Sequence, residues 1–200
     1  MDNKSKTIES YNKHARHYSE YYKGLLDLNK KTEFLKFIGL LKGEKILDIG
    51  GGAGDHALYF KNQGLDVTCI DLSEGMIKIC KSKGLNCLLK DVEKLDFEES
   101  FFDGVWAVTS LLHVPKANLP NVLKKISKVL KEDGIAMFCV KEGEGETMIV
   151  DKHDSETKRF FAFWKKDELT SLLKKDFEII EIHESRPKTT NYLFFFLRKK

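Results

Sequence analysis

The 200-residue sequence contains no apolar run that approaches the ~20 residues of a membrane span, so we expect no contact with a membrane. Its first residues, MDNKSKTIESYNKH, lack the apolar segment of a secretory signal. There is also little excess of charge, because 34 Lys and Arg residues stand against 31 Asp and Glu residues. The resulting net charge of +3 is too small to indicate a nucleic-acid partner.

Cysteine is scarce as well. The chain has 4 cysteines, and Cys69 and Cys139 lie inside apolar, strand-like runs where a free thiol is usually a small core residue. Together with Cys80 and Cys87 they show no paired spacing, so we expect no disulfide bonds and a reducing, cytoplasmic setting. The sequence has neither an HExxH motif nor cysteine pairs, and it therefore predicts no metal centre.

What the sequence does contain is a regular alternation of short apolar runs and helical patterns. Five apolar runs are predicted strands joined as βαβ units: 45–50, 66–71, 86–91, 103–110 and 134–140. Two more, 177–184 and 191–200, are joined by a connection too short for a helix, so they are expected to pair antiparallel. The predicted fold is a doubly wound, mostly parallel, seven-stranded Rossmann-like α/β sheet with an antiparallel strand pair at its C-terminal end.

Two helices have recognisable boundaries. Ser73 is a suitable N-cap for a helix that is expected to stop at Gly84. Pro120 suits the first turn of a second helix, whose apolar residues keep helical spacing and which is expected to run to Gly134.

The most informative stretch is KILDIGGGAGDHA, residues 45–57, where a strand runs into a cluster of glycines. In a doubly wound sheet the first strand-to-helix turn usually holds the cofactor, and glycines let the backbone approach it closely. Two kinds of cofactor compete for this turn. Residues 52–57 nominally fit the dinucleotide pattern G-x-G-x-x-A, whereas the series D-x-G-x-G-x-G from Asp48 to Gly54 suits a ligand with a cationic amino group.

Two further carboxylates stand in register with the glycine loop. Asp71 ends the second predicted strand, where a carboxylate can accept hydrogen bonds from two ribose hydroxyls. Asp91 follows the third predicted strand, where an acid can meet an adenine amino group, although Glu93 and Asp96 lie close to it in the sequence.

With these residues the chain resembles the class I S-adenosylmethionine-dependent methyltransferases over nearly its whole length. YNKHARHY resembles the opening helix motif of the family, ILDIGGGAGDH its glycine loop, and CIDLSEGMI its ribose strand with the following helix. LLKDVEKLDFEESFFDGVWAVTSLLHV resembles the adenine acid with the fourth strand, and LPNVLKKISKVLKEDGIAMFCV the helix that leads into the fifth. The family's sheet has seven strands, and the last is inserted antiparallel beside the fifth.

The resemblance implies S-adenosylmethionine as the cofactor. The residues that it implies for cofactor binding are Tyr11, Asp48, Gly50, Gly52, Gly54, Asp71, Leu72, Met76, Asp91, Val92 and Thr109. It further implies a single domain, residues 1–200, in four parts: a helical N-terminal lid (1–42), a cofactor-binding core (43–140), a substrate-side insertion (141–164) and a C-terminal helix with the strand pair (165–200).

The expected reaction moves a methyl group to an O, N or S atom of a small molecule by in-line displacement. The candidate catalytic residues are His113, after the fourth strand, and Tyr18. A histidine at that place is either a base poised by its near-neutral pKa or an ordinary loop residue. The candidates for substrate binding are Lys141, Glu142, Phe161 and Trp164, of which the two aromatic residues form either an apolar wall or ordinary core.

Other functions stay open from the sequence. The second choice, after a methyltransferase, is a non-catalytic, S-adenosylmethionine-binding regulatory module. The third is an NAD(P)-binding reductase, although a chain of this length has little room for a second, catalytic lobe. The stretch TSLLHV lacks the Asn or Asp, two prolines and aromatic residue that amino-nucleobase methyltransferases usually carry after this strand. We therefore expect a small-molecule substrate, no nucleic acid, and a monomer or homodimer.

Overall fold

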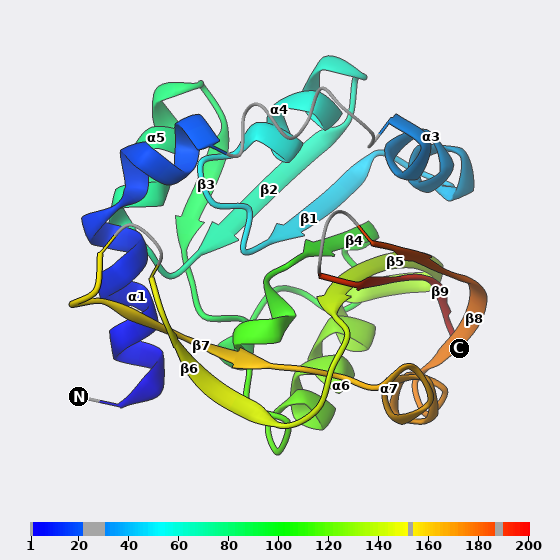
Figure 1. Cartoon of the computed structure of the whole chain (residues 1–200). Helices are drawn as coiled ribbons and strands as arrows, with labels where there is room; N and C mark the ends of the chain where they lie inside the picture. Colours follow the sequence, from blue (N-terminus) through cyan, green and yellow to red (C-terminus); the bar gives the residue numbers. More distant parts are fainter. Residues whose placement is uncertain (1, 22–30, 152–153, 187–189) are drawn as a thin grey trace.

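The computed structural model describes residues 2–21, 31–151, 154–186 and 190–200. Its centre is a seven-stranded sheet in the order β3-β2-β1-β4-β5-β9-β8 (Figure 1). The strands from β3 to β5 pair in parallel, and β9 pairs antiparallel with both β5 and β8. The strands are β1 (Lys45–Ile49), β2 (Asp66–Asp71), β3 (Asn86–Leu89), β4 (Phe102–Val108), β5 (Leu130–Lys141), β8 (Phe177–Ser185) and β9 (Tyr192–Lys199).

This arrangement confirms the predicted fold class, and β9 lies beside β5 as the family resemblance implies. Helices cover both faces of the sheet, so the central strands are buried on both sides and read as nearly continuous apolar runs. The helices on one face are α3 (Lys31–Leu40), α4 (Asp55–Asn62) and α5 (Glu74–Ser82), and those on the other are α6 (Leu119–Val129) and α7 (Lys166–Leu173).

Each face has its own hydrophobic core. Successive side chains of a strand point to opposite faces, so Trp106 of β4 packs with Phe34 and Phe60 on the side of α3 and α4. Val105, its neighbour in the strand, belongs to the core under α6 and α7. The two cores hold the sheet rigid and leave the carboxyl ends of the parallel strands to form a site.

The helix boundaries agree with the sequence in part. The side chain of Ser73 caps α5 by accepting a hydrogen bond from the amide of Met76, and Pro120 lies in the first turn of α6, as predicted. The prediction that α6 runs to Gly134 is wrong. It ends at Val129, because Leu130 is extended and pairs with Phe102 at the start of β5.

A β-hairpin that the sequence analysis does not predict stands outside the main sheet. Its strands are β6 (Glu146–Val150) and β7 (Lys158–Ala162), within the stretch expected to be a polar connection followed by an aromatic segment. Four of the five residues of β6 are exposed, so no apolar alternation marks this strand. β7 instead buries Phe160, Phe161 and Ala162 and packs against α1 (Asn3–Lys13) (Figure 1).

The N-terminal region is helical, as expected. Asp2 caps α1 by accepting a hydrogen bond from the amide of Ser5, and residues 15–21 form a second helical segment. Residues 22–30 of the expected N-terminal lid (1–42) lie outside the described residues. None of the helices in the described ranges is long and apolar enough to cross a membrane.

The prediction that the chain has no disulfide bond is wrong. Cys80 near the end of α5 is bonded to Cys87 in β3, with 6.3 Å between their Cα atoms. The turn at Gly84, where φ is 72°, folds β3 back along α5 and brings the two thiols together, which spacing along the sequence could not reveal. The sulfur of buried Cys69 lies within 4.8 Å of both. The expectation of a cytoplasmic setting rested partly on unpaired cysteines and loses that support.

Reduction of this disulfide is expected to lower the free energy of unfolding by about 2 kcal/mol, because a cross-link over 7 residues restricts the unfolded chain. The measurement is urea unfolding with and without a reductant. Cys80→Ala is the matched control, in which the reductant should change nothing. An unchanged wild-type midpoint in reductant would contradict the expectation.

Candidate active site

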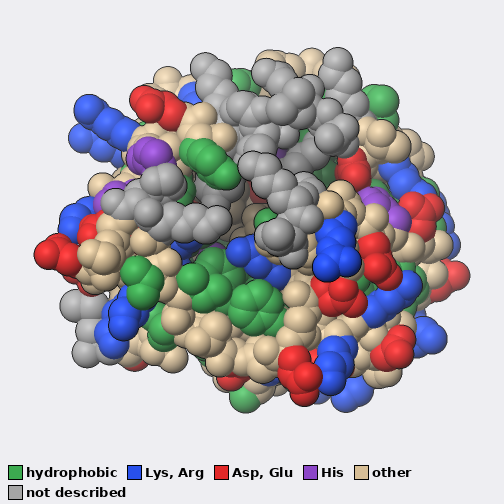
Figure 2. Space-filling view, viewed as in Figure 1, with side chains coloured by type: hydrophobic (Ala, Val, Ile, Leu, Met, Phe, Trp, Pro, Cys, Tyr) green, Lys and Arg blue, Asp and Glu red, His purple; other side chains and the backbone are tan. Residues whose placement is uncertain are grey.

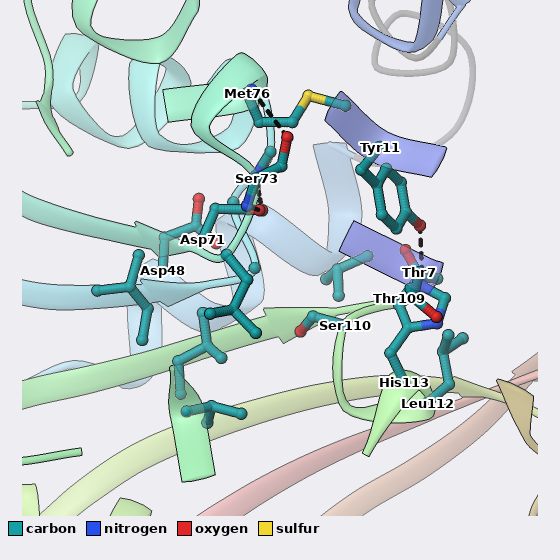
Figure 3. A pocket seen from close by; sticks show the side chains of 18 of the residues that line it. Thr7, Tyr11, Asp48, Asp71, Ser73, Met76, Thr109, Ser110, Leu112 and His113 are labelled. Carbon is teal, nitrogen blue, oxygen red and sulfur yellow. Dashed lines mark hydrogen bonds between the residues drawn. The ribbon is translucent and has the colours of Figure 1, made fainter. Parts of the chain in front are cut away.

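A cavity of about 530 Å³ opens at the carboxyl ends of β1, β2, β4 and β5. Its size is typical of sites for small molecules and cofactors. The glycine loop after β1 and the first residues of α5 form one side of it, and α1, the turn after β4 and β7 form the other. Figure 3 shows Asp48 and Asp71 on the first side, facing Tyr11 and His113 across the cavity.

The glycine loop has the conformation that glycine alone adopts easily. Gly50, Gly52 and Gly54 have positive φ angles of 65°, 55° and 82°. A Cβ at Gly50 would collide with Ser110, whereas one at Gly52 would meet a single atom within 4 Å, Met76 Sδ at 3.9 Å, and would project into the space of the cavity. Gly50 and Gly52 both line the cavity.

Gly54 has a different place from the one expected. It is absent from the lining of the cavity and instead precedes α4, where a Cβ would lie 2.7 Å from both Cys80 Sγ and Leu85 Cδ1. Its missing side chain allows close packing of α4 against α5 and β3. The correction follows from the turn of the chain, which carries the fourth residue of the glycine series away from the ligand space.

Asp48 is the most unusual charged group of the site. Its side chain is buried, and Oδ2 has no hydrogen-bond partner within the described part of the chain. Burial raises the pKa of Asp48 to about 7, and the negative charge of Asp71 contributes to the shift. A buried carboxylate oxygen without a donor is costly, so this atom is suited to a ligand that brings a cation or a hydrogen-bond donor.

Asp71 fixes the shape of the loop. Its Oδ2 accepts a hydrogen bond from the amide of Gly52 at 2.9 Å, and its Oδ1 accepts one from the amide of Ser73 at 2.8 Å. Burial raises the pKa of Asp71, and these backbone hydrogen bonds oppose the rise. Each carboxylate oxygen retains a second lone pair, so Asp71 can still accept hydrogen bonds from a ligand in the cavity.

Asp91 also lines the cavity, and the structure separates it from its neighbours in the sequence. Its Oδ1 accepts the amide hydrogen of Glu93, and its Oδ2 lies 2.9 Å from Nζ of Lys4 in α1. Asp96 is not part of the lining and pairs with Lys90 at the surface. The ion pair with Lys4 ties the end of β3 to the N-terminal helix.

Four of the other residues predicted to bind the cofactor also line the cavity. Leu72, Met76 and Val92 line the cavity with apolar atoms, and Thr109 closes it at the end of β4. Thr109 has a φ of 53°, a strained conformation for a β-branched residue, and its amide donates to the carbonyl of Cys139. Strained backbone of this kind clusters at ligand sites.

His113 follows β4 and is held by two hydrogen bonds. Nδ1 lies 2.5 Å from the carbonyl oxygen of Phe160 and must donate to it, so Nε2 is the acceptor for the hydroxyl of Tyr11 at 2.8 Å. Burial lowers the pKa of His113 to about 3, and the charges of Arg159 and Lys141 add to this effect. The near-neutral pKa expected from the sequence is therefore wrong, and the imidazole is neutral.

Tyr18 belongs to a network that the sequence analysis misses. Its hydroxyl donates to the carboxylate of Asp151, whose side chain is fully buried and also lies 3.2 Å from Nε of Arg159. Nη1 of Arg159 in turn donates to the hydroxyl of Tyr11 at 3.2 Å. These partners come from segments about 140 residues apart, and only the undetected hairpin brings them together.

Two of the four residues predicted to bind substrate line the cavity, namely Lys141 and Phe161. The other two do not. Glu142 accepts a hydrogen bond from the side chain of Asn191, and Trp164 is buried in the core beneath α7. Glu142 follows the end of β5 and Trp164 lies past the end of β7, and neither belongs to the described lining of the cavity.

The fold and the cavity define a Rossmann-like protein that binds a nucleoside cofactor at the carboxyl edge of its sheet. Residues 46–134 match a protein family described as a methyltransferase domain. Sterol 24-C-methyltransferase of Saccharomyces cerevisiae is 31% identical over 153 residues, which make up 69% of this chain and 37% of that protein. Glycine/sarcosine/dimethylglycine N-methyltransferase of Actinopolyspora halophila is 33% identical over 103 residues, 47% of this chain and 18% of that protein.

A solved structure gives the same result for the fold. The 1,6-didemethyltoxoflavin-N1-methyltransferase of Burkholderia thailandensis, crystallised with 1,6-didemethyltoxoflavin and S-adenosylhomocysteine, aligns with a TM-score of 0.77 at 22% identity. The alignment covers 98% of this chain and 88% of that one. Residues 46–134 therefore carry a methyltransferase domain, and the chain is similar in fold to an S-adenosylmethionine-dependent methyltransferase over nearly its whole length. It spans well under half the length of the two curated relatives named above.

Proposed function

We propose that this chain transfers the methyl group of S-adenosylmethionine to an oxygen, nitrogen or sulfur atom of a small molecule by in-line displacement. One observation carries the proposal: Asp48, Asp71 and Asp91 line a single cavity beside the glycine loop, and Asp48 keeps a buried carboxylate oxygen without a donor among the described residues. A pyrophosphate would be repelled by three carboxylates, whereas a cofactor with an ammonium group, a ribose and an adenine suits them.

In this proposal each acid holds one part of the cofactor. Asp48 receives the amino group, Asp71 the ribose hydroxyls and Asp91 the adenine amino group, while Met76 and Val92 pack against the base. When bound, S-adenosylmethionine supplies an activated methyl group on a sulfonium. The protein then has to align the acceptor with that methyl group and exclude water.

The N-terminal helices are proposed to form a lid over the cofactor. Lys4 and Tyr11 of α1 and Tyr18 of the next helical segment line the cavity. The ion pair of Lys4 with Asp91 and the hydrogen bond between Tyr11 and His113 connect α1 to the carboxyl edge of the sheet. Aromatic side chains on such a helix can exclude water while the helix still opens for exchange. Slower hydrogen exchange in residues 3–21 with bound S-adenosylhomocysteine would support the lid, and equal exchange would contradict it.

A small acceptor is favoured over nucleic acid by the distribution of charge. On the face seen in Figure 2, acidic and basic side chains are interspersed rather than gathered by sign. A basic stripe for a phosphate backbone would place one sign of charge along a face. We propose a monomer or homodimer as the working unit.

Calorimetry with S-adenosylhomocysteine and with NADH tests the proposal directly. Binding of the first and not of the second is expected, and the reverse would refute it. Transfer of label from methyl-tritiated S-adenosylmethionine to small molecules of a cell extract then separates the enzyme from a regulatory module that only binds the cofactor.

Asp71→Ala is expected to weaken S-adenosylhomocysteine binding by about tenfold or more. The substitution removes a charged acceptor for the ligand and leaves the amides of Gly52 and Ser73 without their partner, and one such hydrogen bond contributes roughly 1.5–3 kcal/mol. The matched control is Asp96→Ala, an exposed acid outside the cavity. An unchanged dissociation constant in folded Asp71→Ala would exclude this residue from the site.

S-adenosylhomocysteine should bind about tenfold more weakly at pH 6 than at pH 8. The sign follows from the pKa of Asp48, which is about 7 in the free protein: the carboxyl is mostly protonated at pH 6, and the ligand's ammonium group requires the ionised form. Calorimetry across this range measures the change. Asp48→Asn should bind weakly at both pH values, and a full pH dependence in that variant would assign the titration to another group.

A further inference from the structure

The end of the cavity next to His113 is built from two cations and aromatic rings. Nζ of Lys141, the last residue of β5, lies 4.3 Å from the centre of the Phe161 ring. Cζ of Arg159, two residues before Phe161 in β7, lies 5.4 Å from the same centre. Lys141, Arg159 and Phe161 all line the cavity, so two positive charges flank one flat apolar surface there.

Arg159 is fixed in this position. Its Nε lies 3.2 Å from the buried carboxylate of Asp151, Nη1 donates to the hydroxyl of Tyr11, and the guanidinium group lies 4.9 Å from the centre of the Tyr18 ring. A guanidinium group that is already oriented loses little entropy when it binds a planar anion. The network around Asp151 therefore prepares Arg159 for an oxyanion.

The acids of the cavity lie elsewhere. Those on the side proposed for the cofactor are Asp48, Asp55, Asp71, Asp91 and Glu93. Lys4 is ion-paired with Asp91 and Glu93, and Lys83 with Asp55. Glu33, on α3, is paired with His183 of β8. The described lining contributed by α1, the turn after β4, the end of β5 and β7 contains no carboxylate, and the carboxylate of Asp151, which pairs with Arg159, lies outside that lining.

His113 gives an independent indication about the nucleophile. It lies beside Phe161 in the lining of the cavity. Its Nδ1–H donates a hydrogen bond to the carbonyl oxygen of Phe160, and its Nε2 accepts one from the hydroxyl of Tyr11. Its pKa of about 3 makes it a poor proton acceptor. A nucleophile that is already ionised carries no proton and needs no base.

From the two cations that flank the Phe161 ring and from the absence of a carboxylate in the described lining around them, we infer that the methyl acceptor is a small acid whose ionised oxygen takes the methyl group. This inference rests on the proposed function. The new bond forms between the acceptor oxygen and the methyl carbon, the bond from that carbon to sulfur breaks, and its electron pair stays on sulfur as a neutral thioether. No proton is released, so the products are a methyl ester and S-adenosylhomocysteine.

The test is binding of model acids to the complex with S-adenosylhomocysteine, measured by calorimetry. Benzoate and phenylphosphonate present a carboxylate and a phosphonate on a flat apolar body, and benzamide is the neutral analogue of the first. At least one acid should bind tenfold or more tightly than benzamide, and the arm that binds distinguishes the two kinds of oxyanion.

Lys141→Gln should weaken that binding about ten- to a hundredfold, the range for a hydrogen bond to a charged group. Lys116→Gln is the matched control, since Nζ of Lys116 lies 4.5 Å from the Trp164 ring outside the cavity, and it should bind the acid as the wild type does. Lys141 is chosen for substitution rather than Arg159, because loss of Arg159 would remove the ion-pair partner of the buried Asp151 carboxylate and destabilise the fold.

Equal binding of acid and amide, binding of neither, or unchanged binding in Lys141→Gln would each overturn the inference. Failure of the proposed function would be seen in a different measurement, because S-adenosylhomocysteine would then not bind to the protein before any acid is added.

Discussion

Gly52→Val is expected to weaken S-adenosylhomocysteine binding at least roughly 100-fold, or about 3 kcal/mol. Two effects combine. Gly52 has a φ of 55°, which a β-branched side chain adopts only with strain. Its new side chain would also extend into the cavity, since only Met76 Sδ lies within 4 Å of the added Cβ. The ligand would lose both the shape of the loop and the space that it occupies.

The matched control is Gly64→Val. Gly64 has a φ of 88°, is exposed and is not among the residues that line the cavity. No atom of the described residues lies within 4 Å of a Cβ added there. It therefore reproduces the backbone strain without the blocked ligand space, and its affinity should equal that of the wild type. Calorimetry on both variants, with unfolding curves to show that each is folded, makes the comparison. Equal affinity of the Gly52 variant and the wild type would remove this loop from the binding site.

The cofactor half of the site could be predicted because it is local. Asp48, the glycine loop and Asp71 each stand at the end of an apolar strand, and parallel strands deliver their carboxyl ends to one edge of a sheet. The order of the strands follows from the same regularity, since right-handed crossovers leave few alternatives. Of the eleven residues that the family resemblance implies for cofactor binding, ten line the cavity, and Gly54 is the exception.

The substrate half could not be predicted in the same way. Its features depend on the hairpin of β6 and β7, whose exposed first strand carries no apolar alternation. Arg159 and Asp151 meet α1 only through tertiary packing, so neither could be recognised as part of a site from its neighbours in the sequence. The Cys80–Cys87 bond was missed for a similar reason, because a left-handed glycine between them determines where the chain returns.

The second large effect is expected for His113. His113→Ala should lower kcat about 100-fold with the acceptor identified for the wild type, while the dissociation constant of S-adenosylhomocysteine changes little. The imidazole joins the carbonyl of Phe160 in β7 to the hydroxyl of Tyr11 in α1, and its loss would free both elements at the acceptor end of the cavity. Misplacement of reacting groups by about 1 Å can cost a factor of about 100 in rate.

The dependence of kcat on pH separates this positioning role from the general base expected from the sequence. A base acts only when it is deprotonated, so a histidine with a near-neutral pKa would make kcat fall as the pH drops below that value. With its pKa lowered to about 3 by burial, His113 is neutral throughout the range from about pH 5 to 9, and kcat at saturating cofactor should be flat there. His17→Ala, an exposed histidine outside the cavity, is the control and should keep full turnover. A falling limb in the wild type that disappears in His113→Ala would restore the base, and with it an acceptor that carries a proton.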